Sequence, residues 1–145
     1  MAHRYTGGCE HVHTHSDAEP IDNHACHCSV CKRVTGQGTT HVVFFKHADL
    51  GVDHPEALQR QPFNDQNPGG PFELCTCATC GTPVMLDDRE RRVRAIVPNL
   101  MGYGESVAPG SYHAFYDPAS GEPKPDDGRP VYAGLHPDFA WPAPA

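Results

Sequence analysis

The spacing of the cysteines constrains this chain more than any other feature of its sequence. The chain has 145 residues and seven cysteines, at positions 9, 26, 28, 31, 75, 77 and 80. An odd number of cysteines cannot all pair internally, and two-residue gaps between cysteines are typical of metal sites. There is no apolar run like a signal-peptide core and nothing near the ~20 apolar residues of a membrane span, so we expect a soluble, cytoplasmic protein with reduced thiols and no membrane partner. Metal binding is therefore favoured over disulfides.

Length and composition favour one small, mainly β domain over residues 1–145. Only 38% of the residues are hydrophobic, and 14 glycines and 15 prolines indicate short elements joined by turns. A fold of this kind often needs stabilisation beyond hydrophobic burial, which a bound metal provides. The formal net charge of -7 argues against a nucleic-acid partner. We interpret the arginine-rich run at residues 89–94 as a solvated turn and strand face, with an anionic substrate contact as the alternative.

Local sequence patterns predict several short strands. Residues 39–46 are rich in β-branched and aromatic residues, and residues 72–77 lead into the last cysteine pair. Residues 83–86 and 93–97 flank a polar turn and predict a hairpin, and a further strand is expected at residues 112–116.

Three other segments have distinct patterns. In residues 9–15 the cysteine and three histidines alternate, which predicts a strand with all four side chains on one face. Residues 29–35 predict a short helix or turn that ends before Gly36 and Gly38. From residue 117 onward, prolines and glycines predict an irregular tail rather than a second domain.

Cys26, Cys28 and Cys31 form a Cys-x-Cys-x-x-Cys motif that brings three thiols together within six residues. Structural zinc usually has four protein ligands, whereas catalytic zinc has three and leaves one position for water or substrate. Zinc favours thiolate and lowers the pKa of a bound thiol. The motif therefore predicts a catalytic zinc that activates a thiol substrate. His27, inside the motif, is expected to point away from the metal or to orient substrate.

A second, structural zinc site is predicted from Cys9, His11, Cys77 and Cys80. The last two cysteines have the spacing of a zinc knuckle, and Gly81 allows the tight turn that a knuckle needs. Such a site would join the N-terminal region to the middle of the chain, so removing its metal should unfold the protein. His13 and His15 are the alternatives to His11 as the fourth ligand.

Other interpretations of the cysteines stay open. An iron-sulfur cluster also needs thiolates, but neither group reproduces its usual spacings. A redox role for Cys28 and Cys31 needs a thioredoxin-like βαβ setting, which the sequence lacks. Cys75 is left over, either as a small buried hydrophobic residue or as a regulatory thiol or accessory ligand.

Three motifs resemble those of the glutathione-dependent formaldehyde-activating enzymes and their relatives named after centromere protein V. They are GGCEH at residues 7–11, CHCSVC at residues 26–31 and CATCG at residues 77–81. A weaker match, DGRPVY at residues 127–132, extends the resemblance over roughly residues 5–132. The chain departs from the family pattern at His11, where the family has cysteine, and at Thr76, where it usually has an aromatic residue.

The resemblance implies a small β-tent (Mss4-like) fold with two zinc ions and the same division of ligands. It implies glutathione as the thiol partner and a small carbonyl compound such as formaldehyde as the second substrate. We therefore expect a zinc-dependent carbon-sulfur lyase or synthase, in which Cys26, Cys28 and Cys31 form the catalytic set. The alternative is a zinc-stabilised binding module without turnover, which a fourth ligand from Cys75 or a histidine at this set would favour.

Overall fold

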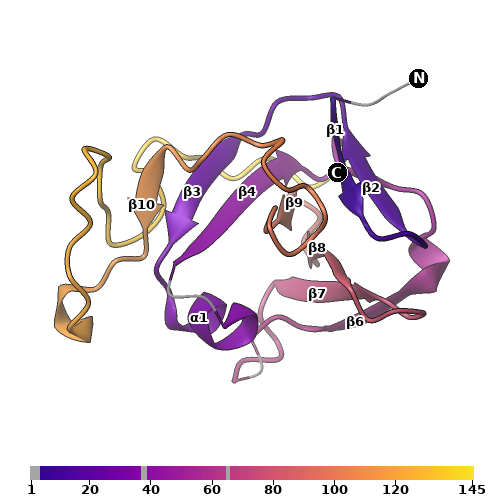
Figure 1. Cartoon of the computed structure of the whole chain (residues 1–145), viewed down its shortest axis with the longest axis horizontal. Helices are drawn as coiled ribbons and strands as arrows, with labels where there is room; N and C mark the ends of the chain where they lie inside the picture. The colour runs from indigo at the N-terminus through magenta and orange to yellow at the C-terminus, as the bar shows by residue number, and fades with distance from the viewer. Residues whose placement is uncertain (1–3, 37–38, 65) are drawn as a thin grey trace.

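The structure is a computed structural model that describes residues 4–36, 39–64 and 66–145. In these residues the strands form two sheets (Figure 1), so the chain is mainly β as expected. A seven-stranded sheet has the order β10-β3-β4-β9-β8-β7-β6, and a three-stranded sheet has the order β1-β2-β5. All neighbours in the large sheet run antiparallel except β10 and β3, which are parallel.

The strands are β1 (Tyr5–Gly8), β2 (His13–Ser16), β3 (Asp22–Cys26), β4 (Thr40–Lys46), β5 (Gly51–Val52), β6 (Leu58–Pro62), β7 (Phe72–Cys77), β8 (Pro83–Asp88), β9 (Val93–Ile96) and β10 (Tyr112–Ala114). The helical elements are α1 (Ser29–Thr35) and the 3-10 turns η1 (Pro55–Ala57) and η2 (Pro118–Ser120). No helix in the described part of the chain is long and apolar enough to cross a membrane.

Most of the predicted elements are confirmed. The apolar segments become β4 and β7, the polar turn joins β8 to β9, and the short helix is α1. This helix ends at Gly36, which has a φ of 72°, a conformation that glycine adopts without strain. Gly38 lies outside the described residues.

The predicted strand over residues 9–15 is wrong. The chain instead forms an antiparallel hairpin of β1 and β2, and residues 9–12 make its turn. Gly8 has a φ of 96°, and the N–H of Cys9 donates to the carbonyl of Val12 at 2.8 Å, so the backbone reverses where the alternation predicted an extended strand. The period-two pattern of histidines therefore did not indicate a single strand face.

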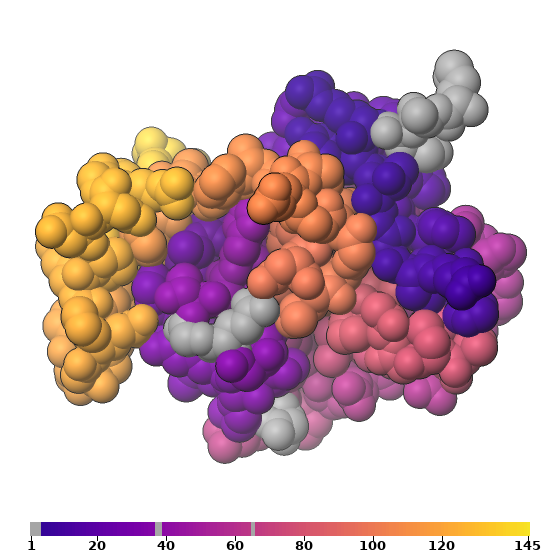
Figure 2. All heavy atoms as spheres, in the orientation of Figure 1, coloured from indigo at the N-terminus to yellow at the C-terminus, as the bar shows by residue number. Residues whose placement is uncertain are grey.

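The core lies along the large sheet, and β4 is one of its inner strands. Residues Val42 to Phe45 are all buried, because β4 is covered on both faces. The chain after β10 is irregular apart from η2 and an isolated bridge between His113 and Val131. Its first part, in orange and amber, lies on the opposite side of the molecule from the indigo N-terminal hairpin (Figure 2).

Candidate metal centres and their surroundings

Six of the seven cysteines gather into two triads. In each triad the three Sγ atoms lie within 4.8 Å of one another, and all seven cysteines are free thiols. We call them the helix triad, formed by Cys26, Cys28 and Cys31, and the knuckle triad, formed by Cys9, Cys77 and Cys80.

The helix triad is built where β3 passes into α1. Cys26 is the last residue of β3, Cys28 is the N-cap of α1, and Cys31 lies in the first turn of the helix. The Sγ of Cys26 lies 3.3 Å from the Sγ of Cys28 and 3.3 Å from the Sγ of Cys31. The strand end and the helix start therefore fix three sulfurs around one point.

The electrostatics of the helix triad favour one thiolate among the three sulfurs. Hydrogen bonds from the thiols of Cys26 and Cys31, together with the N–H of Cys31 at 3.3 Å, lower the pKa of Cys28 to about 3. The hydrogen bond with Cys28 raises the pKa of Cys26 to about 12, and those with Cys26 and Cys28 raise the pKa of Cys31. Without a cation, a second negative charge at this point is strongly disfavoured.

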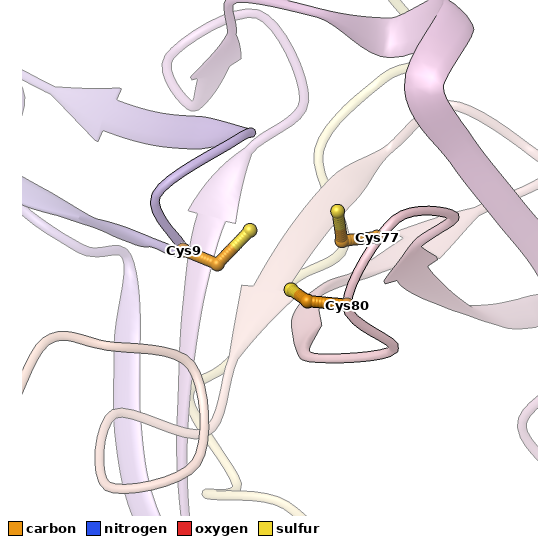
Figure 3. Close-up of side chains that lie close together, drawn as sticks. All are labelled: Cys9, Cys77 and Cys80. Atoms are coloured by element: carbon orange, nitrogen blue, oxygen red, sulfur yellow. The ribbon is translucent and has the colours of Figure 1, made fainter.

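The knuckle triad joins the hairpin turn after β1 to the turn between β7 and β8. In Figure 3 the three Sγ atoms point toward one another from these two segments. Gly81 has a φ of 77°, and its N–H donates to the carbonyl of Cys77 at 2.8 Å, which closes the tight turn predicted for a knuckle. A β-bulge between Cys75 and Thr76 shifts the register just before Cys77.

The knuckle triad is more open to solvent than the helix triad. Cys77 is buried, Cys9 is half-buried and Cys80 is exposed. Hydrogen bonds from the side chain and N–H of Thr82 lower the pKa of Cys80 to about 7. Burial raises the pKa of Cys9, although the N–H groups of His11 and Val12 point toward its sulfur and partly oppose this.

His11 does not join the knuckle triad. Its side chain is exposed, and its ring nitrogens do not belong to the group of ligand atoms within 4.8 Å. The hairpin turn brings the backbone N–H of His11 to the sulfur of Cys9, whereas an extended strand would have presented its ring on the same face. Its role as the fourth ligand therefore stays a prediction.

A cavity of about 440 Å³ borders the helix triad but not the knuckle triad. The three cysteines of the helix triad line this cavity, and most of the other lining residues are aromatic or aliphatic. Ligand sites commonly have this size and apolar character, with a few polar groups that fix orientation. Both triads therefore consist of three cysteines, but only the helix triad borders this cavity.

His24 is a cavity residue that the sequence analysis did not single out. It lies on β3, two residues before Cys26, and only 1% of it is exposed. Its Nδ1 lies 2.6 Å from Oδ2 of Asp22, and the hydroxyl of Tyr112 donates to the other oxygen of that carboxylate at 2.7 Å. The signal that could have found it is the alternation of Asp22, His24 and Cys26 on one face of a strand.

His27 lies outside the helix triad. Its ring is buried, with Nδ1 at 2.9 Å from Glu122 and Nε2 at 2.8 Å from Nδ1 of His113. The other nitrogen of His113 lies 2.8 Å from Asp127. Because both ring nitrogens of His27 are engaged, this residue ties the segment between Cys26 and Cys28 to the later part of the chain.

Cys75 belongs to neither triad. It is fully buried in β7, and burial raises the pKa of its thiol to about 11. It therefore has the environment of a small hydrophobic residue rather than of a reactive thiol.

The arginines of residues 89–94 are largely engaged in ion pairs. Arg92 lies 2.8 Å from Asp88, and Arg94 lies 3.2 Å from Asp87. The pKa of Asp88 is lowered because hydrogen bonds from Arg92 and from backbone N–H groups outweigh the effect of burial. The run does form a turn and a strand face, with Arg89 and Arg91 exposed as predicted, but Arg92 and Arg94 are only partly exposed and pair with acids of the same hairpin.

Both triads suit a thiophilic metal ion by their chemistry. A tetrahedral zinc with bonds of about 2.3 Å separates its sulfur ligands by about 3.8 Å. The sulfurs of the helix triad already lie 3.3 Å apart in two of their pairs, and those of the knuckle triad lie within 4.8 Å. Binding therefore requires only small shifts of the side chains.

The fold and these sites define a mainly β protein with two cysteine triads that can hold metal, one of them beside a ligand-sized cavity. The chain belongs to the family described as glutathione-dependent formaldehyde-activating enzyme, whose model matches residues 4–117. A search of curated proteins found no match to the chain. Family membership indicates an enzyme that acts on formaldehyde with glutathione as a small thiol partner.

Proposed function

We propose that this protein is a zinc-dependent carbon-sulfur lyase or synthase that adds the thiol of glutathione to a small carbonyl compound and reverses the reaction. The observation that carries this proposal is the position of the helix triad in the wall of the cavity. A ligand that enters this cavity would come into contact with three cysteines that could hold zinc. Membership of the formaldehyde-activating family supports glutathione and formaldehyde as the first pair of substrates to test.

Cys26, Cys28 and Cys31 would hold the catalytic zinc. When bound there, zinc lowers the pKa of a thiol ligand and keeps it ionised near neutral pH. Among the described residues, no other His, Cys, Asp or Glu joins this triad, so it leaves one ligand position open for substrate. An open position beside a ligand-sized cavity weighs against the non-catalytic binding module.

The proton balance of the reaction requires one group that accepts the thiol proton and returns it to the carbonyl oxygen. We assign this role to His24, because it lines the cavity and Asp22 holds its Nδ1. With the proton on Nδ1, Nε2 accepts the thiol proton, the sulfur attacks the carbonyl carbon, and Nε2 then protonates the resulting alkoxide. The product is an S-hydroxyalkyl adduct, and cleavage follows the same steps in reverse.

Cys9, Cys77 and Cys80 would hold the structural zinc, with His11 as the fourth ligand. The three cysteines already lie together, and the exposed ring of His11 would need to turn toward them. This site would crosslink the N-terminal hairpin to the β7–β8 turn, which is a contribution to folding rather than to chemistry.

The test is metal analysis followed by detection of the product. We expect two zinc ions per chain, and NMR should show S-hydroxymethylglutathione forming from formaldehyde and glutathione faster than without protein. The Cys28→Ser variant, which we expect to keep only the zinc of the knuckle triad, is the matched control for nonspecific thiol chemistry. Adduct formation at the uncatalysed rate with fully metal-loaded protein would refute the enzyme proposal and favour the binding module.

A further inference from the structure

The cavity beside the helix triad is much larger than formaldehyde. Its volume is about 440 Å³, whereas one water molecule occupies about 30 Å³ in the liquid, and formaldehyde has only two non-hydrogen atoms. Cavities of several hundred Å³ are typical of sites for drug-sized ligands. A substrate as small as formaldehyde would leave most of this space unused.

The lining of the cavity is mostly apolar and carries few polar side chains. Apart from the thiols, its polar side chains among the described residues are His24, Asn64 and Asn67, and none of the described lining residues is an acid, a lysine or an arginine. Glutathione carries two carboxylates and an ammonium group, which are costly to bury without partners. Its charged ends therefore belong outside the cavity, and the space inside suits an apolar group.

The C-terminal part of the chain builds one wall of this cavity. Leu135 and Trp141 line it together with Phe44 and Phe72 of the large sheet. The ring of Trp141 lies 5.8 Å from that of Phe44 and 6.3 Å from that of Phe72, and the guanidinium of Arg92 lies 4.1 Å from the centroid of the Trp141 ring. Trp141 remains 40% exposed, as expected for a residue at the rim.

This wall lies beyond the part of the chain that the family model matches. The match ends at residue 117, whereas Leu135 and Trp141 follow it. The conserved chemistry of a family and its substrate range need not come from the same segment, since substrate range follows from the shape of the pocket. The C-terminal wall is thus the part of the site that can give this chain its own preference.

We propose that the carbonyl substrate of this protein carries an aromatic or similarly bulky apolar substituent, and that Leu135 and Trp141 determine this preference. The inference rests on the proposed addition of a thiol to a carbonyl group. The substituent lies against Phe44, Phe72 and Trp141, which places the carbonyl carbon at the helix triad and beside His24. Aromatic side chains favour such a ring through offset and edge contacts.

Binding can be tested without turnover because Trp141 is the only tryptophan of the chain. Its fluorescence is titrated with S-benzylglutathione and, for comparison, S-methylglutathione, two thioethers that cannot react. We expect the benzyl compound to change the emission and to bind at least about tenfold more tightly, because its additional carbons leave water for an apolar site. Equal affinity of the two compounds would overturn the proposal.

A leucine pair provides the matched variants. Leu135→Ala removes part of the cavity wall, whereas Leu100→Ala removes the same atoms from a leucine that is also partly buried but does not line the cavity. We expect Leu135→Ala to weaken binding of S-benzylglutathione several-fold and Leu100→Ala to leave it unchanged. Loss of binding in both variants, or in neither, would contradict the role of the C-terminal wall.

Kinetics then separate this inference from the function on which it rests. With glutathione as the thiol, we expect kcat/KM for benzaldehyde to exceed that for formaldehyde, and Leu135→Ala and Trp141→Ala to lower this ratio by about tenfold. Turnover of formaldehyde with no preference for benzaldehyde overturns the inference and leaves the function intact. No turnover of either aldehyde, even if S-benzylglutathione binds, overturns the proposed function and the substrate with it.

Discussion

Each of the two cysteine triads offers three sulfur atoms, but the two triads differ in their surroundings. The helix triad comes from six consecutive residues and borders a cavity, whereas the knuckle triad joins residues far apart in the sequence and reaches the surface at Cys80. Three thiolates are therefore not enough to tell a catalytic site from a structural one. The difference lies in what each triad connects and in what can approach it.

The segments that each triad connects determine how much a bound metal would contribute to the fold. At the helix triad, β3 and α1 are already neighbours along the chain, so a metal there would constrain little that the backbone has not fixed. At the knuckle triad, a metal would hold the turn of the β1–β2 hairpin to the β7–β8 turn. Closing this longer loop reduces the entropy of the unfolded chain more.

The largest effect is expected from Cys77→Ser, which removes the buried sulfur of the knuckle triad. Structural zinc sites contribute about 10 kcal/mol or more of apparent binding energy to folding, so losing one ligand should unfold or aggregate the protein. Circular dichroism, thermal melting and zinc content check this. A folded Cys77→Ser variant with its full complement of zinc would show that the two roles are assigned wrongly.

Cys28→Ser should separate activity from folding. Serine is itself a favourable N-cap, so α1 should persist, while the helix triad loses a thiolate and its zinc. We expect adduct formation to fall to the uncatalysed rate in a folded protein that retains one zinc ion. Cys75→Ala is the control, because it removes a buried thiol that belongs to neither triad. Wild-type activity in Cys28→Ser would show that the helix triad is not the catalytic site.

His24→Gln should affect catalysis alone. Loss of a positioned acid-base group typically costs about 10²–10⁴-fold in rate, so kcat should fall while zinc content stays at the wild-type value. His41→Gln is the matched control, since His41 lies on the neighbouring strand and bonds to Asn23 rather than lining the cavity. If both variants lose activity equally, the effect is structural and His24 is not the proton carrier.

The sequence predicted those parts of the molecule that depend on local spacing. Cys26, Cys28 and Cys31 are close in sequence, so one strand end and one helical turn suffice to bring them together. The Cys77–Gly81 turn was predictable for the same reason, because its geometry follows from two cysteines and a glycine. The partnership of Cys9 with this turn was also anticipated, since a knuckle with two ligands is incomplete.

The sequence failed where tertiary contacts override local pattern. The alternation from Cys9 to His15 indicated one strand, but Gly8 and the hydrogen bond from Cys9 to Val12 turn the chain there. His24 is one of 11 histidines, and its alternation with Asp22 and Cys26 is informative only if this segment is a strand, which the sequence did not predict and β3 shows. The cavity was beyond prediction as well, because Leu135 and Trp141 reach it from a segment with no regular pattern.

The smallest expected effect is that of His11→Ala, and it decides whether the knuckle triad is closed. If His11 turns toward the metal, its loss leaves three thiolates, so zinc affinity at this site should fall by about 10–100-fold and the melting temperature should drop less than in Cys77→Ser. Glu10→Ala, which changes an exposed neighbour in the same turn, is the control. Competition with a chelator measures the affinity. Unchanged affinity in His11→Ala would mean that both triads bind metal through three cysteines, and the contrast between them would then rest on the cavity alone.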